Sequence, residues 1–88
     1  MSNRNNIPIG IDGHQRATKD DLKISQNIEA LFNGPLGGEV LLYLKSITIN
    51  MVSGPEITDR ELRHLEGQRY LVGLIERRMN HAINKRKS

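Results

Sequence analysis

The chain has 88 residues, 36% of them hydrophobic, a net charge of +3 and no cysteine. This length allows one small domain whose own core gives marginal stability, and the missing cysteines exclude disulfides and thiolate metal sites. Oligomerisation or a partner is therefore the expected source of further stability. No apolar run approaches the roughly 20 residues of a membrane helix, and the polar start MSNRNN is unlike a secretory signal, so no membrane association is expected.

Residues 1–17 are expected to form an extended N-terminal arm. Proline and glycine recur in this stretch and no helical period is present. Its isoleucines alternate as in an extended segment and are a candidate protein interface: Ile7, Ile9 and Ile11. A disordered terminus is the alternative.

A first helix is predicted from about Thr18, with the threonine as its cap and carboxylates in the first turn, where they favour the helix dipole. An apolar stripe follows, formed by Ile24, Ile28, Leu31 and Phe32. The sequence Asn33-Gly34-Pro35 should end the helix, because glycine suits a helix C-terminus and proline cannot continue it.

A second helix is predicted from about Gly38 to about Met51. Its apolar stripe consists of Val40, Leu44, Ile47 and Met51. The stretch SITINMV at its end is rich in β-branched residues, so a short strand is an alternative there.

A third helix opens with TDRE, in which Thr58 and Glu61 form a capping box. Its apolar positions continue to Ile83, which predicts a helix that extends to about Asn84 and overhangs the core of so small a domain. The expected fold is all-α: a small antiparallel helical domain of three helices (18–84), with the extended arm (1–17), a long C-terminal helix and a basic tail (85–88).

The middle of the third helix is a candidate protein interface, because it is apolar on nearly every side and contains two glycines. Glycine in a helix interior costs roughly 1 kcal/mol, which is reasonable where another backbone comes close. The alternative is a crowded contact within the chain. Arg69 could pair with Glu66 one turn back or with Glu39. The interface residues expected here are Gly67, Arg69, Tyr70, Leu71, Gly73 and Leu74.

The C-terminal end is basic. After Glu76 the chain has five cations and no acid, which leaves eight basic and ten acidic residues, a net charge of −2, in the rest. Such an end can contact double-stranded DNA without sequence preference, or an acidic partner. A solvated helix end is the alternative. The candidate contacts are Arg77, Arg78, Lys85, Arg86 and Lys87.

No enzymatic chemistry is indicated. The three histidines are far apart in sequence, without an HExxH pattern, and GPLGGE lacks the lysine and hydroxyl of a phosphate loop. We therefore expect no catalytic residues, no metal and no cofactor.

The segments GGEVLLYLKSI and RELRHLEGQRYLVGLIERRM resemble a family of small structural-gene proteins of tailed bacteriophages, first named from a Bordetella phage. The resemblance covers about residues 29–80, although family members often carry an acid where this chain has Leu42-Tyr43. The matching positions are Phe32, Gly38, Val40, Leu41, Leu44, Gly67, Arg69, Val72 and Ile75.

This resemblance implies a non-enzymatic component of the virion, made in the host cytoplasm. It would be a homo-oligomer in a symmetric ring at or near the portal or neck, or inside the head beside it, in contact with portal or neck proteins. Two alternatives stay open: a small DNA-binding regulator or packaging factor that uses the basic tail, and a cement protein on the capsid surface.

Overall fold

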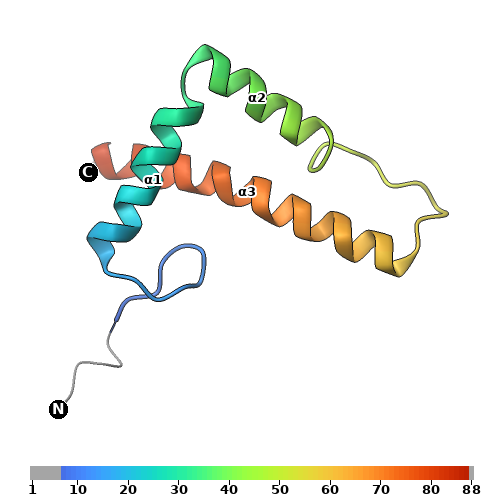
Figure 1. Ribbon diagram of the computed structural model, residues 1–88, viewed down its shortest axis with the longest axis horizontal. Coiled ribbons are helices and arrows are strands. Elements are labelled where there is room, and N and C mark those ends of the chain that lie inside the picture. Colours follow the sequence, from blue (N-terminus) through green and yellow to red (C-terminus); the bar gives the residue numbers. More distant parts are fainter. Residues whose placement is uncertain (1–6, 88) are drawn as a thin grey trace.

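A computed structural model describes residues 7–87 of the chain. In this part of the chain the structure consists of three α-helices: α1 (Thr18–Phe32), α2 (Pro35–Ser46) and α3 (Asp59–Lys87). The predicted all-α fold with a long C-terminal helix is confirmed. Figure 1 shows α2 and α3 as an antiparallel hairpin, with α1 crossing the C-terminal half of α3.

The N-terminus of α1 differs from the prediction by one residue. Ala17 is extended (ψ 144°) and precedes the helix, so Thr18 is the first helical residue and makes no cap. Asp20 and Asp21 do lie in the first turn, where negative charge is favourable.

The corner between α1 and α2 is tighter than expected, because Pro35 begins the second helix. Proline suits this position, since the first helical N–H groups have no partner within the helix. Gly37 is required at the corner: a Cβ there would overlap the Leu31 carbonyl oxygen and lie 2.7 Å from the Cα of Phe32.

The second helix ends at Ser46, five residues before the predicted Met51. Residues 47–50 form turns rather than the alternative strand. The Thr48 hydroxyl donates to the Leu44 carbonyl at 2.6 Å and so helps to close the helix. Leu41 and Thr48 are buried against the rest of the molecule, whereas Val40 and Ile47, which the sequence placed in the core stripe, are more than 40% exposed.

The third helix contains 29 residues and is therefore about 43 Å long. The predicted capping box is confirmed, because the Glu61 N–H donates to Thr58 Oγ1 (3.1 Å) and the Thr58 N–H donates to Glu61 Oε1 (3.0 Å). The helix continues through the predicted basic tail to Lys87.

Residues 7–17 are not the extended arm that the sequence suggested. They form a closed loop, in which Ile9 and Gln15 make an antiparallel bridge and the Gly10 N–H donates to the His14 carbonyl at 2.8 Å. Gly13 has a φ of +87°, a conformation that favours glycine, at the tip of this loop. The rest of the predicted arm, residues 1–6, lies outside the described residues.

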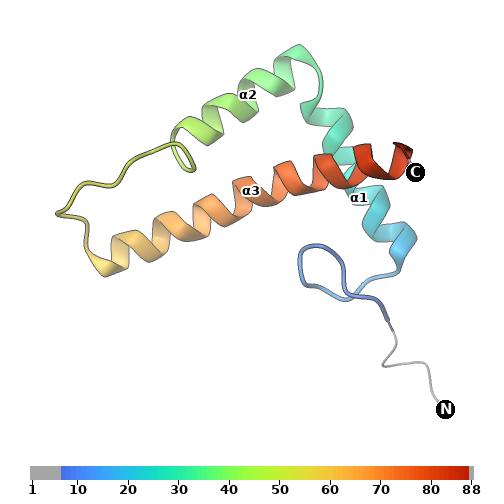
Figure 2. The ribbon, with the colours of Figure 1, turned by 180° about the vertical axis from the view of Figure 1, so that it is seen from behind.

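The molecule is thin: α2 and α3 lie side by side, and within residues 7–87 only α1, which crosses the C-terminal half of α3, covers part of them. The molecule measures 54 × 36 × 17 Å, and the view from behind in Figure 2 shows no helix that covers the hairpin on that side, within the part of the chain described. The main helix contact is between α1 and α3, and α2 touches α3 much less.

Candidate functional site

The contact between α1 and α3 is built around polar side chains. Within residues 7–87 the buried apolar residues are only Leu41, Leu65, Val72 and Ala82. The buried polar residues are Asp21, Ser25, Glu29, Thr48 and Arg78. On α1 the buried line is Asp21, Ser25 and Glu29, spaced four residues apart, while the predicted apolar stripe beside it is only partly covered.

Arg78 is the centre of this contact. It is 2% exposed, and its Nη2 lies 2.9 Å from Asp21 Oδ1 and 3.2 Å from Asp12 Oδ2. Its Nη1 donates to the Asp21 carbonyl oxygen (2.8 Å) and to Ser25 Oγ (3.0 Å). The prediction that Arg78 contacts DNA or an acidic partner is therefore wrong, because the guanidinium is enclosed by its own chain.

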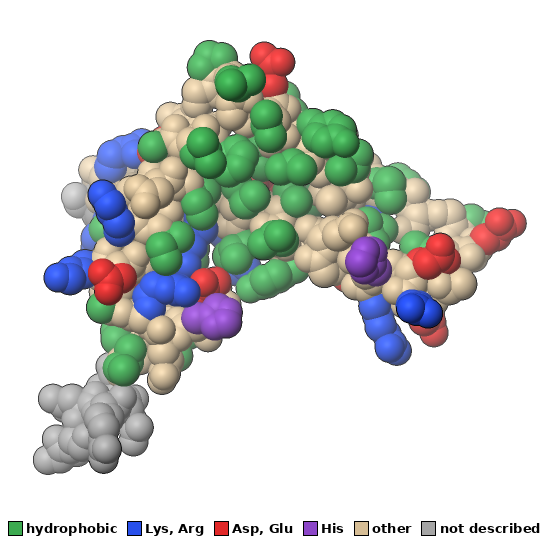
Figure 3. All heavy atoms as spheres, viewed as in Figure 1, with side chains coloured by type: hydrophobic (Ala, Val, Ile, Leu, Met, Phe, Trp, Pro, Cys, Tyr) green, Lys and Arg blue, Asp and Glu red, His purple; other side chains and the backbone are tan. Residues whose placement is uncertain are grey.

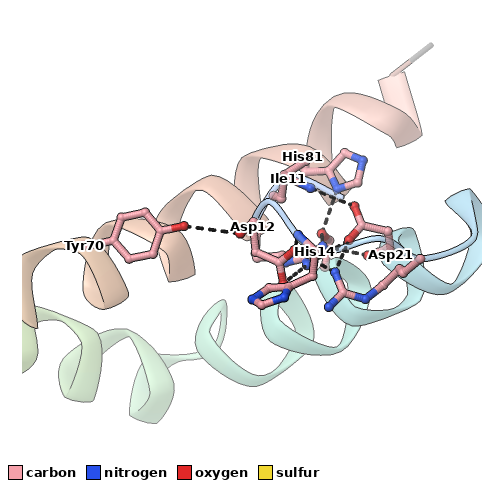
Figure 4. Close-up of polar contacts among 9 residues, drawn as sticks. Ile11, Asp12, His14, Asp21, Tyr70 and His81 are labelled. Atoms are coloured by element: carbon pink, nitrogen blue, oxygen red, sulfur yellow. Dashed lines mark hydrogen bonds and ion pairs between the residues drawn. The ribbon is translucent and has the colours of Figure 1, made fainter. Parts of the chain in front are cut away.

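The N-terminal loop completes the same network, here called the Arg78 cluster (Asp12, Arg16, Asp21, Ser25 and Arg78). Arg16 Nη1 lies 2.8 Å from both Asp12 Oδ1 and Asp21 Oδ1. Figure 4 shows Asp12 on the loop directed toward this network, and the Tyr70 hydroxyl reaching from α3 to the Asp12 carbonyl oxygen at 3.5 Å. The loop is thus tied to both α1 and α3.

Both carboxyl groups of the cluster are stabilised in the ionised form. The hydrogen bond from Arg16, followed by the His14 backbone N–H, holds the pKa of Asp12 far below its usual range. For Asp21, burial opposes ionisation, but hydrogen bonds from Arg78 and Arg16 outweigh it and lower the pKa. The cluster is a structural ion network rather than a proton donor.

Ser25 and His81 form a serine–histidine pair, with Ser25 Oγ 2.7 Å from His81 Nδ1. The serine is fully buried, and its oxygen also accepts a hydrogen bond from Arg78. A substrate could not reach this hydroxyl in the folded protein. The pair therefore positions α1 on α3 and does not resemble an activated nucleophile.

The remaining predicted cations lie near the C-terminal end of α3. Arg86 pairs with the buried carboxylate of Glu29 at 2.7 Å. Arg77 lies over the Tyr70 ring, 5.5 Å from its centre. Lys85 and Lys87 are exposed, and Figure 3 shows Lys and Arg side chains gathered on the left, over α1 and the C-terminal end of α3.

Arg69 links two parts of its own chain and is not free to contact a partner. Its Nε donates to the Thr48 carbonyl (3.0 Å) and its Nη2 to the Met51 carbonyl (2.6 Å), which holds the end of α2 and the following loop to α3. Its Nη1 also pairs with Glu66 at 2.6 Å, so of the two predicted partners Glu66 is confirmed and Glu39 is not.

The two glycines of α3 do not serve a crowded contact within the chain. Among the described residues, no neighbouring side chain or other helix lies within 4 Å of the position that a Cβ would take at Gly67 or Gly73. Being six residues apart, they point about 120° away from each other around the helix. Gly67 shares its exposed side with Tyr70 and Leu71, which are 53% and 61% exposed.

The other predicted interface residues are partly available. Leu74 and Gly73 are half-buried, Ile7 and Ile9 on the loop are exposed, and Ile11 is half-buried, its N–H donating to Asp21 Oδ2 at 3.3 Å. Ile11 thus lies beside the same chain's α1, whereas Ile7 and Ile9 are exposed on the closed loop.

Most of the exposed large hydrophobic side chains in the described chain lie elsewhere, on α2 and the residues that flank it. Figure 3 shows hydrophobic side chains gathered over α2 and the adjoining part of α3. An apolar groove of about 380 Å³ lies at the corner of α1 and α2, lined by Leu31, Phe32, Leu36, Val40 and backbone of the corner. The sequence prediction missed this surface because it assigned Val40 and Ile47 to the core.

In residues 7–87, no group of three or more His, Asp or Glu side chains could hold a metal ion. Within the same range, no helix has the length and apolar character needed to cross a membrane.

Comparison with known proteins adds no relative. The sequence matches no protein family, and neither a curated protein nor a solved structure is detectably similar to it.

Proposed function

We propose that this protein is a non-enzymatic assembly subunit that works by associating with copies of itself and with other structural proteins. The observation that carries the proposal is the thin fold, in which α1 covers only the C-terminal half of α3. A stable domain normally buries the apolar faces of its helices between at least two layers of secondary structure. Here apolar side chains of α2 stay exposed in the described chain, which leaves their burial to another chain.

The dimensions of the molecule support this proposal quantitatively. Its radius of gyration is 16.2 Å, against about 12 Å for a compact domain of this length. Its accessible surface is 6745 Å², roughly 1,500 Å² above that of a compact monomer of the same mass. Obligate interfaces cover on the order of 1,000 Å² or more of each partner, so the excess is large enough for one.

In biological terms, we propose that the protein is a component of a tailed-phage particle. It is supported by the resemblance of residues 29–80 to small phage structural-gene proteins. Residues Phe32, Val40, Leu41 and Val72 of that pattern lie in helices of one flat unit that is short of core. The partners we propose are portal or neck proteins at the head–tail junction or beside it inside the head.

Two surfaces are available for such partners. The outer side of α3 presents Gly67, Tyr70 and Leu71, with Arg77 next to the tyrosine ring. The C-terminal end of the same helix offers the exposed cations Lys85 and Lys87, which suit an acidic rim or packaged DNA.

The deciding experiment is the solution mass of the full chain, measured by light scattering on a sizing column over a range of concentrations. A discrete oligomer is the expected result. A monomer at every concentration would contradict self-association. Repeating the measurement at high salt separates an apolar interface, which persists, from one held by surface charge, which weakens.

DNA binding through the basic end is a second candidate function, favoured by the cations gathered at that end in Figure 3. The variant Lys85→Gln/Lys87→Gln keeps the Arg86–Glu29 pair and removes two exposed charges. A regulator or packaging factor would lose duplex affinity in this variant and show a shallower salt dependence. An assembly subunit would keep its oligomeric state unchanged.

A further inference from the structure

The outer face of α2 carries an unpaired apolar stripe. Leu36, Val40, Tyr43 and Ile47 follow one another at steps of four, three and four residues, the spacing of a helix that packs along a second helix. Their exposed fractions are 78%, 44%, 61% and 43%, so the rest of the described chain covers them only in part. The inward side of α2 is a different face, marked by the buried Leu41 and Thr48.

The two ends of the stripe differ in shape. At the N-terminal end it runs into the apolar groove of about 380 Å³ at the corner, where Leu31 is 66% exposed. At the C-terminal end it continues into a protruding loop, where Val52 is 90% exposed. The neighbouring Met51 lines a second hollow of about 700 Å³ together with the start of α3. The stripe therefore runs from an apolar groove at one end of α2 to the protruding Val52 at the other.

We infer that two copies of this chain pair through their α2 stripes, antiparallel and related by a two-fold axis. Centring the pair between Val40 and Tyr43 places Val40 opposite the partner copy's Tyr43, and Leu36 opposite the partner copy's Ile47. In this antiparallel arrangement the loop that carries Val52 in one copy extends toward the end of α2 that carries the groove in the other copy. Groove and loop then approach each other twice, as a two-fold interface requires.

A second copy fits this surface better than an unrelated partner does. Each end of the stripe is the complement of the other, which is the condition for self-pairing. The face is apolar along its length, and Lys45, one of two charged residues on α2, is already paired with Glu76 at 2.9 Å. The pairing also covers the side of α2 that α1 and α3 leave exposed. This inference rests on the proposed self-assembly and names the surface that performs it.

Disulfide trapping tests the register directly, because the natural chain has no cysteine. Leu36→Cys and Ile47→Cys chains are mixed, allowed to assemble and oxidised. The antiparallel register predicts a mixed disulfide between residues 36 and 47, whereas each variant alone stays uncrosslinked, since like positions lie about 16 Å apart along the helices. Efficient disulfides between like positions would indicate a parallel pair and overturn the proposal.

A second variant separates this interface from self-assembly in general. Tyr43→Arg places a charge in the centre of the stripe and should weaken self-association at least tenfold, with the helical content unchanged by circular dichroism. Leu62→Arg, an exposed apolar position (38%) on α3 outside both proposed surfaces, is the control and should leave the mass unchanged. If the Tyr43→Arg variant still forms the oligomer, the α2 pairing is wrong but self-assembly is not. If Leu71→Arg dissociates the oligomer and Tyr43→Arg does not, the interface lies on α3. A wild-type chain that is always monomeric contradicts the assembly function itself.

Discussion

Arg78 and Asp21 form the central contact of this fold, with Nη2 and Oδ1 2.9 Å apart and both residues no more than 5% exposed. Asp21 belongs to α1 and Arg78 to α3, so the pair joins elements that are far apart in sequence. A buried ion pair adds little net stability over apolar packing, but removal of one partner leaves an uncompensated buried charge. The Arg78 cluster therefore specifies how α1 is placed on α3.

Arg78→Ala is expected to lower the free energy of unfolding by about 3 kcal/mol or more, because Asp21 loses its main partner. A domain this small has limited stability to lose, so the variant should be partly unfolded at 25 °C. Urea titration followed by circular dichroism measures the change.

Arg77→Ala is the matched control, one residue earlier on an exposed side of α3. Its loss of a contact with the Tyr70 ring should cost less than about 1 kcal/mol. Equal effects of the two alanine variants would show that the cluster does not hold the fold together. Arg78→Met/Asp21→Leu, which removes both charges, should recover much of the stability lost in Arg78→Ala.

Acid should weaken the fold through Asp12 and Asp21. Both have pKa values below that of an unfolded aspartate, about 3.9. The stability they contribute is therefore fully present above about pH 5 and is lost as the pH falls through the unfolded value toward the folded ones. The free energy of unfolding, measured by urea titration from neutral pH down to about pH 2, should decline in that acidic range.

Asp12→Asn should flatten this pH dependence. The variant is less stable than the wild type at neutral pH, because the amide cannot replace the carboxylate beside Arg16 and Arg78. The two proteins should converge in acid, where the wild-type carboxyl is itself protonated. Asp20→Asn, an exposed neighbour in the first turn of α1, is the control and should keep the wild-type slope. Parallel curves for Asp12→Asn and wild type would contradict this role of Asp12.

The helices could be predicted from the sequence because their signals are local. The Thr58–Glu61 capping box, the Asn33–Pro35 break and the apolar period each act within one or two turns. The α1–α3 contact depends on pairs separated by more than fifty residues, which no local pattern reveals. One signal was present: Asp21 and Glu29 are eight residues apart, as are their partners Arg78 and Arg86.

The site predictions were wrong for residues whose burial differs from what is usual for their type. The sequence groups Arg78 with the exposed cations of the C-terminal end, although its face of α3 turns toward α1. Helical spacing predicts a core position for Val40 and Ile47, because apolar residues at this spacing are normally buried. In so thin a fold an apolar stripe can instead face outward, and only the arrangement of the helices shows which stripe does so.

Arg69→Ala should loosen the connection between α2 and α3. The side chain donates to the carbonyl oxygens of Thr48 and Met51, and the loss of these bonds should cost about 1–3 kcal/mol. Backbone amides of residues 47–58 should exchange hydrogen faster, while those of the α1–α3 contact change less. Arg63→Ala, exposed on the same helix, is the control. Unchanged exchange in residues 47–58 of Arg69→Ala would show that other contacts hold this loop.

Gly37 and Gly67 should respond in opposite directions to the same substitution. Gly37→Ala forces a Cβ into the Leu31 carbonyl oxygen at the corner of α1 and α2, so the corner must open and stability should fall by more than about 1 kcal/mol. Gly67→Ala places its methyl in open space and should stabilise α3 by up to about 1 kcal/mol, from helix propensity alone. Thermal unfolding at a concentration where the chain is monomeric measures both changes. If Gly67→Ala stabilises the monomer but weakens the oligomer, a neighbouring backbone lies against that side of α3; if it stabilises both, the glycine side of α3 is not an interface.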